Sequence, residues 1–296
     1  MSISAQQVKE LRERTGLGMM ECKVALMETG GDMDAAADLL RKRAGAKVEK
    51  KSGRIAAEGT INIFVSPDRK IAAMVEVNCE TDFVAKGEEF VAFAASAAAR
   101  VANKQPADVD ALYALPGGNG APGTIAQLRE GLVMKLGEKI NVRRFENMSA
   151  VNGHIGSYVH HGSKIGALVM MEGGDETLAR DIAMHIAASR PEYISKEQVP
   201  VAAIAKEKEI FSEQAKDSGK PPEIIEKMVM GRINKYLNEI TLLGQPFVKD
   251  PDTTVEKLLK SKGANVKGFI RFEVGEGLEK RSDNFAAEVM ATAKGA

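Results

Sequence analysis

Residues 59–77 of this 296-residue chain read GTINIFVSPDRKIAAMVEV. Two short runs rich in β-branched and apolar residues, 60–65 and 70–77, flank the sequence Ser-Pro-Asp-Arg at residues 66–69. β-branched runs favour strands, and proline and aspartate between them favour a tight turn. The stretch therefore predicts a β-hairpin.

The same pattern returns 94 residues later, where residues 153–171 read GHIGSYVHHGSKIGALVMM. The two stretches align without gaps and are identical at seven of nineteen positions, namely Gly59/Gly153, Ile61/Ile155, Val65/Val159, Lys70/Lys164, Ile71/Ile165, Ala73/Ala167 and Val75/Val169. A helical pattern follows each copy, at about residues 87–103 and 176–189. Repetition of one such unit predicts a core of two related β-hairpin-plus-helix halves.

Residues 1–54 predict a small module of three short helices. Ser4 and Gln7 have the spacing of a capping box for the first helix, and the second is expected at residues 19–28. An aspartate, Asp32 or Asp34, can cap a third helix that runs to about Arg43. Residues 41–54 hold seven Lys or Arg and one Glu. This basic stretch fits either a solvated helix end and linker or a contact for phosphate or an acidic partner.

The C-terminal part predicts a helical hairpin, a strand and a final helix. Apolar residues recur at helical spacing on both sides of a Gly-Lys-Pro-Pro break, which indicates an antiparallel hairpin at about 199–243. A strand is expected at 268–274 and a short helix at 284–294. Residues 111–128 are interpreted as a loop running into a helix.

The predicted fold class is therefore α+β. A three-helix N-terminal module with its basic linker occupies residues 1–54, and the first core half occupies 55–150. The second core half, with the inserted helical hairpin, occupies 151–280, and a C-terminal helix module occupies 281–296.

Composition limits the function. Lys plus Arg and Asp plus Glu balance at 41 each. A chain of zero net charge does not hold nucleic acid mainly by its overall field, so we expect no DNA partner. We expect no membrane span and no leader sequence, and two isolated cysteines, Cys22 and Cys79, suit a reducing compartment. The expected location is cytoplasmic.

The sequence lacks the motifs of common catalytic sites. Residues 118–123 match G-x-G-x-x-G by letters, but they follow no predicted strand and place Pro122 where a helix should begin, so we interpret them as a linker. His154, His160, His161 and His185 have no metal-ligand spacing, and Cys22 is interpreted as a packed thiol. We therefore expect no enzymatic activity, no metal and no cofactor, and a protein that works by surface contact.

The two halves differ between the second strand and its helix. The first half holds residues 78–87, NCETDFVAKG, whereas the second has only residues 172–175, EGGD. The insert places an aromatic residue, Phe83, beside a carboxylate, Asp82. Loops on a rigid scaffold often carry function, which makes this insert a candidate site. The alternative is that Asp82 caps the next helix and Phe83 packs into the protein's own core.

At this insert, residues 76–86 (EVNCETDFVAK) resemble the hallmark segment of the bacterial elongation factor Ts family. Agreement extends along nearly the whole chain, at residues 11–16 (LRERTG), 18–23 (GMMECK), 185–189 (HIAAS), 218–221 (SGKP), 244–247 (GQPF) and 268–275 (GFIRFEVG). Two departures are Val24, where the family commonly has a polar residue, and a longer loop at 117–123. The resemblance implies a guanine-nucleotide exchange factor for elongation factor Tu, with an N-terminal module of the ubiquitin-associated type.

The resemblance also implies which residues contact that partner. Thr81, Asp82, Phe83 and Val84 would enter near its magnesium and phosphate site, and the further contacts would be Met19, Met20, Lys23, Leu136, Gly137, Glu138 and His160. The protein would bind elongation factor Tu with GDP bound and without nucleotide, and would bind no nucleotide itself. A second hypothesis is a ribosome- or RNA-associated protein that uses residues 41–54. A hydrolase or transferase is disfavoured by the missing motifs.

Overall fold

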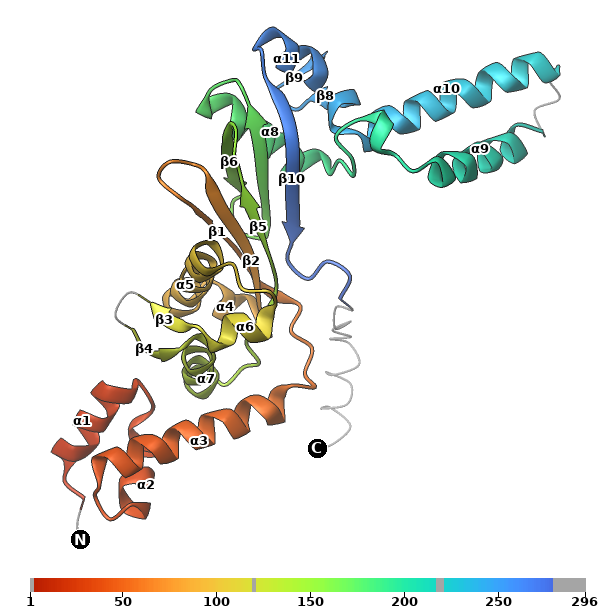
Figure 1. The fold of residues 1–296 in the computed structure, drawn as a ribbon. Helices are drawn as coiled ribbons and strands as arrows, with labels where there is room; N and C mark the ends of the chain where they lie inside the picture. Colours follow the sequence, from red (N-terminus) through yellow and green to blue (C-terminus); the bar gives the residue numbers. More distant parts are fainter. Residues whose placement is uncertain (1–2, 119–120, 217–220, 279–296) are drawn as a thin grey trace. The chain divides into compact units, whose positions relative to one another are not determined.

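The computed structural model describes residues 3–118, 121–216 and 221–278 (Figure 1). Contacts divide the chain into two units. Among the described residues, unit 1 holds 3–62, Val75–Phe145 and 273–278, and unit 2 holds Ile63–Met74 and Glu146–Phe272. The α+β class is confirmed. The domain boundaries at residues 54, 150 and 280 stay predictions, and the helix expected at 284–294 lies outside the described residues.

The N-terminal module is built from α1 (Ala5–Thr15), α2 (Met19–Glu28) and α3 (Met33–Lys51). The capping box of Ser4 and Gln7 is present, and Gly16 ends α1 in a left-handed conformation with φ of 70°. Leu11, Leu26 and Leu40 supply one fully buried side chain from each helix to the shared core. Burial of one apolar stripe per helix is what holds so small a bundle together.

The third helix is longer than the sequence indicated. Asp32 caps it by accepting from the N–H groups of Asp34 and Ala35, both at 2.9 Å. The expected end at Arg43 is wrong, because the helix continues to Lys51. Residues 44–51 contain no proline and a single glycine, Gly45, which costs an exposed helix only about 1 kcal/mol. Most of the basic stretch is therefore helix rather than linker.

The first core half begins with β1 (Glu58–Val65) and β2 (Ile71–Cys79), followed by α4 (Asp82–Ala85) and α5 (Glu88–Lys104). The predicted hairpin and helix are confirmed. The half continues through α6 (Val109–Ala114), β3 (Pro116–Gly118), β4 (Ala121–Thr124), α7 (Ile125–Leu136) and β5 (Asn141–Ser149). The sheet order is β1-β2-β5, and β3 pairs with β4.

The loop expected at 111–128 does run into a helix, α7, but the irregular structure expected before that helix, and the linker expected at 118–123, are wrong for the described residues. Residues 119–120 lie outside the described residues. This region holds α6, the antiparallel β3–β4 pair and the first turn of α7. Thr124 and Gln127 form a capping box that starts α7. That Thr-x-x-Gln spacing is a local signal for a helix start. The two strands before it are very short and rich in glycine and proline, a composition that indicates a loop.

The second half repeats the order of elements. It contains β6 (His154–Val159), β7 (Ile165–Glu172), α8 (Glu176–Ser189), β8 (Pro246–Phe247), β9 (Asp250–Thr254), α11 (Val255–Ser261) and β10 (Asn265–Glu273). Its sheet order is β6-β7-β10, which matches β1-β2-β5. The helix α8 lies so close to β6 at Gly156 that a Cβ there would be 2.6 Å from the Ala179 backbone. The expected helix at 176–189 and the expected strand at 268–274 are both confirmed.

Special backbone conformations also recur in the two halves. Arg69 and Ser163, 94 positions apart, are non-glycine residues with φ of 56° and 55° in the two hairpin turns. Gln105 and Arg190 end α5 and α8 with φ of 46° and 51°. Non-glycine residues seldom adopt a positive φ, so matching instances indicate a common local design. The repetition thus extends beyond the stretches that align by sequence.

The inserted helical hairpin consists of α9 (Val201–Lys216) and α10 (Pro222–Ile240), which run antiparallel in Figure 1. Val229, Ile233 and Leu237 of α10 are buried and pack with Phe211 of α9. Pro222 lies in the first turn of α10, where its missing N–H costs nothing. The predicted hairpin is confirmed. In the described part of the chain, we find no helix with the length and apolar character needed to cross a bilayer.

Candidate functional site

The loop that follows β2 is closed by a single turn of helix. Thr81 begins α4, and its Oγ1 accepts a hydrogen bond from the N–H of Val84 at 3.4 Å. The interpretation of Asp82 as the cap of the helix at 87–103 is wrong, because Gly87 is the N-cap of α5 and Asp82 lies in the additional turn α4, which Thr81 caps. Asp82 instead pairs with Lys86 at 2.7 Å, one turn along, and a hydrogen bond from Lys86 to that carboxylate raises the pKa of the lysine.

Phe83 projects into solvent from this turn. Its side chain is 83% exposed, whereas Ala85, two residues on, is buried. The interpretation that Phe83 packs into the protein's own core is therefore wrong. Val84 is half-buried and Thr81 is exposed. The loop thus presents an aromatic ring and a carboxylate side by side, with neither group needed for the core.

Two glutamates hold the loop by exchanging hydrogen bonds. Glu138 follows Gly137, the left-handed residue that ends α7 with φ of 75°. Its Oε2 accepts from the N–H groups of Glu80 and Thr81, both at 3.0 Å, and its Oε1 accepts from the Thr81 hydroxyl at 2.6 Å. In return, Oε1 of Glu80 accepts from the N–H of Lys139 at 2.7 Å. We call these four bonds the Glu80–Glu138 clasp.

Residues 51–54, at the end of the basic stretch, contact the residues of the Glu80–Glu138 clasp and their neighbours. Lys51 Nζ donates to the carbonyl of Gly137 at 2.5 Å, and Arg54 pairs with the Glu80 carboxylate at 3.2 Å. Lys139 Nζ donates to the carbonyls of Ser52 and Arg54 at 2.6 and 2.8 Å. Each pair is partly exposed and individually weak, but several bonds between the same segments act together.

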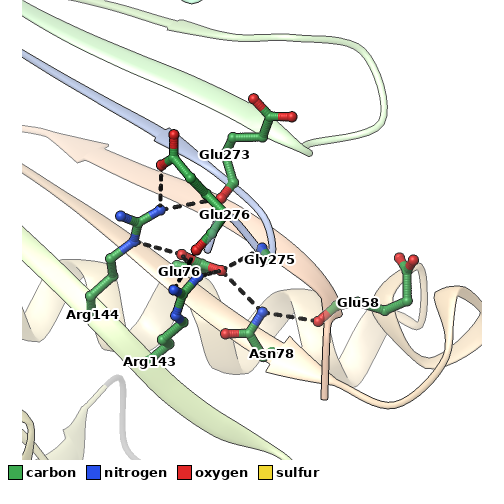
Figure 2. Close-up of polar contacts among 8 residues, drawn as sticks. All are labelled: Glu58, Glu76, Asn78, Arg143, Arg144, Glu273, Gly275 and Glu276. Atoms are coloured by element: carbon green, nitrogen blue, oxygen red, sulfur yellow. Dashed lines mark hydrogen bonds and ion pairs between the residues drawn. The ribbon is translucent and has the colours of Figure 1, made fainter. Parts of the chain in front are cut away.

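A buried carboxylate, Glu76, lies on β2 just before the loop (Figure 2). It accepts hydrogen bonds from Arg143 Nη1 at 3.1 Å, Arg144 Nε at 2.7 Å, Asn78 Nδ2 at 3.1 Å and the N–H of Gly275 at 2.8 Å. Burial alone would raise the pKa of Glu76, but these donors outweigh it and lower the pKa below its ordinary value. The network joins β2, β5 and the segment after β10.

The other predicted contact residues belong to other elements of the chain. Met19 and Met20 are 59% and 67% exposed on α2, and Lys23 is exposed on the same helix. Leu136 is half-buried at the end of α7. His160 lies in unit 2, in the turn after β6, where its Nδ1 is 3.1 Å from the Tyr158 hydroxyl. The structure thus brings together residues 81–84 with Gly137 and Glu138.

Groups suited to metal or nucleophilic chemistry are not gathered here. Across residues 3–118, 121–216 and 221–278, we find no cluster of three or more His, Cys, Asp or Glu that could hold a metal ion. Cys22 is fully buried in the N-terminal core, as predicted for a packed thiol. Cys79 is also buried, and its Sγ lies 3.1 Å from the Thr81 carbonyl.

Sequence reasoning missed Glu76 and Glu80. Glu76 had a usable signal, because it is a charged residue within a strand that is otherwise apolar up to Val77. A buried charge needs partners, so such a residue predicts a polar network. Glu80 had no such signal, because its partners Lys139 and Arg54 lie 59 and 26 positions away.

Comparisons with known proteins agree with the earlier resemblance. The family model for elongation factor Ts matches residues 80–276. The elongation factor Ts of Methylococcus capsulatus is 61% identical over 291 residues, which cover 98% of each chain. That of Thioalkalivibrio sulfidiphilus is 58% identical over 296 residues and the full length of both chains. The chain therefore belongs to the elongation factor Ts family of translation elongation factors.

Proposed function

We propose that this protein is the guanine-nucleotide exchange factor for elongation factor Tu. It binds that partner with GDP bound and without nucleotide, and it promotes GDP release by displacing magnesium and phosphate contacts. The observation that carries the proposal is Phe83, whose ring is 83% exposed beside Asp82 on a loop held by hydrogen bonds. Membership of the elongation factor Ts family supports the choice of partner.

Burial of the Phe83 ring supplies free energy for this task. A phenylalanine side chain removes about 150–250 Å² from water when it is buried, worth at most about 4–6 kcal/mol at 25 cal/mol per Å². Each tenfold weakening of a nucleotide complex requires about 1.4 kcal/mol. One ring inserted between elements of the partner can therefore account for weakening by at most about three to four orders of magnitude.

Asp82 adds an electrostatic contribution. A carboxylate brought near a diphosphate repels it and competes for the groups that donate hydrogen bonds to it. Magnesium requires nearly ideal octahedral geometry, so a small displacement of its ligands weakens the metal site. The Asp82–Lys86 pair is solvent-exposed and contributes little to folding, so the carboxylate is available to rearrange on binding.

Exchange of this kind needs no covalent step, and in this proposal the protein is not an enzyme acting on a bond. If the factor weakens GDP binding to the partner, GDP weakens binding of the factor by the same ratio. The protein itself contributes no nucleotide site and requires no cofactor. Its effect comes from the free energy of its own binding to elongation factor Tu, which opposes the free energy of GDP binding to the same partner.

The second hypothesis, RNA or ribosome binding through residues 41–54, loses support from the structure. Most cations of this stretch have partners within the chain: Arg41 with Asp38, Arg43 with Glu28, Lys47 with Glu21, Lys51 with the Gly137 carbonyl and Arg54 with Glu80. A cation engaged with a carboxylate is a weaker phosphate ligand than an unpaired one. The stretch stabilises the N-terminal module and the base of the loop.

Release of fluorescent GDP from elongation factor Tu, with and without this protein, tests the proposal. We expect faster release in millimolar magnesium. Because the proposed mechanism displaces magnesium, the stimulation should shrink when excess EDTA removes the metal beforehand. Unchanged release in magnesium would refute the exchange function, and equal stimulation with and without EDTA would refute the magnesium step.

A further inference from the structure

We propose that Glu138 is a positioning residue, whose carboxylate fixes the loop that carries Phe83 and does not itself contact the partner. This inference rests on the proposed exchange function. Three of the oxygen positions on the carboxylate are already occupied by the N–H groups of Glu80 and Thr81 and by the Thr81 hydroxyl. A carboxylate has about four such positions, so little of its capacity remains for a partner.

The bonds act on the backbone of residues 80 and 81, just before Asp82 and Phe83; we call Phe83 the wedge residue, because its ring is proposed to insert into the partner. Thr81 donates two of them, through its N–H and its hydroxyl, and it is also the N-cap of α4, whose second residue is Phe83. An isolated single turn of helix is unstable in water, because its nucleation is unfavourable. The clasp therefore supplies order that the four-residue helix cannot supply itself. Hydrogen bonds to a charged acceptor are the strong ones, which suits this task.

The second half has a short turn, residues 172–175, in place of the long loop, and it carries no residue equivalent to Phe83 there. There the residue after the left-handed Gly263 is Ala264, which is buried, where the first half has Glu138 after Gly137. The short turn of residues 172–175 meets this place directly, because a Cβ on Gly173 would lie 2.2 Å from the Gly263 carbonyl oxygen. The half with the long loop thus holds it with the Glu138 carboxylate. In the half with the short turn, the backbones of Gly173 and Gly263 lie directly against each other.

Glu80 also takes part in holding the loop, through its own side chain. Its side chain accepts from the N–H of Lys139, directly after Glu138, while Glu138 accepts from the N–H of Glu80. The side chain of each glutamate therefore holds the backbone of the segment that contains the other glutamate. Such reciprocal bonding fixes distance and direction together, which is what presentation of a rigid ring requires.

Amide hydrogen exchange in the free protein provides the first test, because it needs no partner. Glu138→Ala should speed exchange of the Glu80 and Thr81 amides by roughly tenfold or more. Glu138→Gln should stay near wild type, because its amide oxygen can accept from both N–H groups and its NH₂ can donate to Thr81. Glu130→Ala, which truncates a half-buried glutamate in α7, the helix that precedes Glu138, is the control and should leave both amides unchanged. Unchanged exchange in Glu138→Ala overturns the proposal.

Nucleotide release provides the second test. At saturating protein, Glu138→Ala should lower the maximal rate of GDP release by roughly tenfold and shift the half-saturating concentration by less than about twofold, with rescue by Glu138→Gln. In a Phe83→Ala background, Glu138→Ala should have a much smaller effect, because the ring is gone and Asp82 is the remaining proposed contact that the loop positions. An equal loss in both backgrounds means direct partner contact and overturns the proposal.

The outcomes separate this inference from the function on which it rests. If Phe83→Ala does not slow release, the proposed wedge is wrong, whereas the amide exchange of Glu80 and Thr81 still decides whether the clasp orders the loop. If Glu138→Ala fails to fold, Glu138→Asp replaces it. That variant keeps the charge but is one methylene too short for the backbone contacts, so it should behave as the alanine variant does.

Discussion

Gly59 and Gly153 lie 94 positions apart at the start of the two hairpins, Gly59 in β1 and Gly153 directly before β6, and each lies against the second strand of its hairpin. A Cβ on Gly59 would lie 2.1 Å from the carbonyl oxygen of Val77, and one on Gly153 would lie 1.9 Å from that of Met171. Val77 and Met171 are also 94 positions apart. Both glycines have positive φ, of 151° and 82°. The repeat therefore has glycine at both positions for a steric reason, because a side chain there would collide with the opposite backbone.

Replacement of either glycine by alanine should therefore destabilise the protein. Strain from the positive φ and the contact with the opposite backbone together should lower the free energy of unfolding by about 2–4 kcal/mol. Urea titration followed by circular dichroism measures the change. Gly131→Ala is the control, because Gly131 lies in α7 with open space around it. There alanine should stabilise the helix by about 0.5–1 kcal/mol.

Phe83→Ala should separate stability from function. Because the ring is 83% exposed, its removal should change the free energy of unfolding by less than about 0.5 kcal/mol. Stimulated GDP release from elongation factor Tu should nevertheless slow markedly. Val201→Ala, which truncates another exposed apolar side chain, should leave release unchanged. A loss of several kcal/mol of stability in Phe83→Ala would contradict the exposed position of the ring.

Phe90→Ala is the opposite case in the neighbouring helix. This side chain is fully buried on α5. Truncation of a buried phenylalanine leaves a cavity and typically costs about 3–5 kcal/mol. Thermal unfolding should show a clear drop in the midpoint. A midpoint within error of wild type would mean that α5 does not depend on Phe90 for its packing.

Glu76→Gln should weaken the network that joins β2, β5 and the residues after β10. Loss of the charge leaves Arg143 and Arg144 with weaker acceptors, and we expect a loss of about 2–3 kcal/mol at pH 7. Glu146→Gln, an exposed glutamate, should cost less than about 0.5 kcal/mol. The free energy of unfolding in urea distinguishes the two variants.

The contribution of Glu76 should also depend on pH. Its pKa is lowered in the folded state, so its stabilising effect is present above the unfolded value of about 4.3 and is lost as the pH falls through the folded value. The difference between wild type and Glu76→Gln should therefore narrow in acid. A constant difference from pH 7 down to pH 3 would contradict ionisation of Glu76 in the folded protein.

His185 should make unit 2 sensitive to mild acid. Burial lowers the pKa of this histidine. Nδ1 accepts from the N–H of Val248 at 3.2 Å, and Nε2 lies 2.9 Å from Oε1 of Gln245, whose amide group donates to the carbonyls of Ser189 and Glu239. These partners fit the neutral ring with its proton on Nε2, and protonation would break the bond from Val248.

Because the folded pKa of His185 lies below the unfolded value of about 6.5, its contribution is complete above that value and declines as the pH falls below it. We expect the free energy of unfolding to fall by up to about 1.4 kcal/mol per pH unit from this group. His185→Gln should be less stable at pH 7 but should lose less on acidification to pH 5. Parallel pH profiles of the two proteins would contradict the prediction.

Features set by neighbouring residues were predictable from the sequence. The capping box of Ser4 and Gln7 marks the start of α1, and Pro222 marks the start of α10, because both signals act within one helical turn. The hairpins were predictable because β-branched runs surround a turn. The candidate loop was found through the contrast between residues 78–87 and 172–175, which needs no knowledge of contacts.

Features set by distant residues were not predictable. The Glu138 carboxylate meets the backbone N–H of Glu80 across a sequence separation of 58 residues, and nothing in the sequence near either residue indicates the other. The end of α3 was misplaced because Lys-rich sequence is equally compatible with helix and linker. There the contact of Lys51 with the Gly137 carbonyl fixes the last turn, and that contact comes from the tertiary structure.

The short turn of residues 172–175 makes the second half a natural recipient for loop transplantation. Grafting residues 78–87 in its place would not be sufficient, because Ala264 offers no acceptor where the donor half has Glu138. A graft combined with an acid at position 264 would carry both the ring and the group that orients it. A duplicated scaffold of this kind lets a designer move an activity within one chain while the original copy serves as an internal standard.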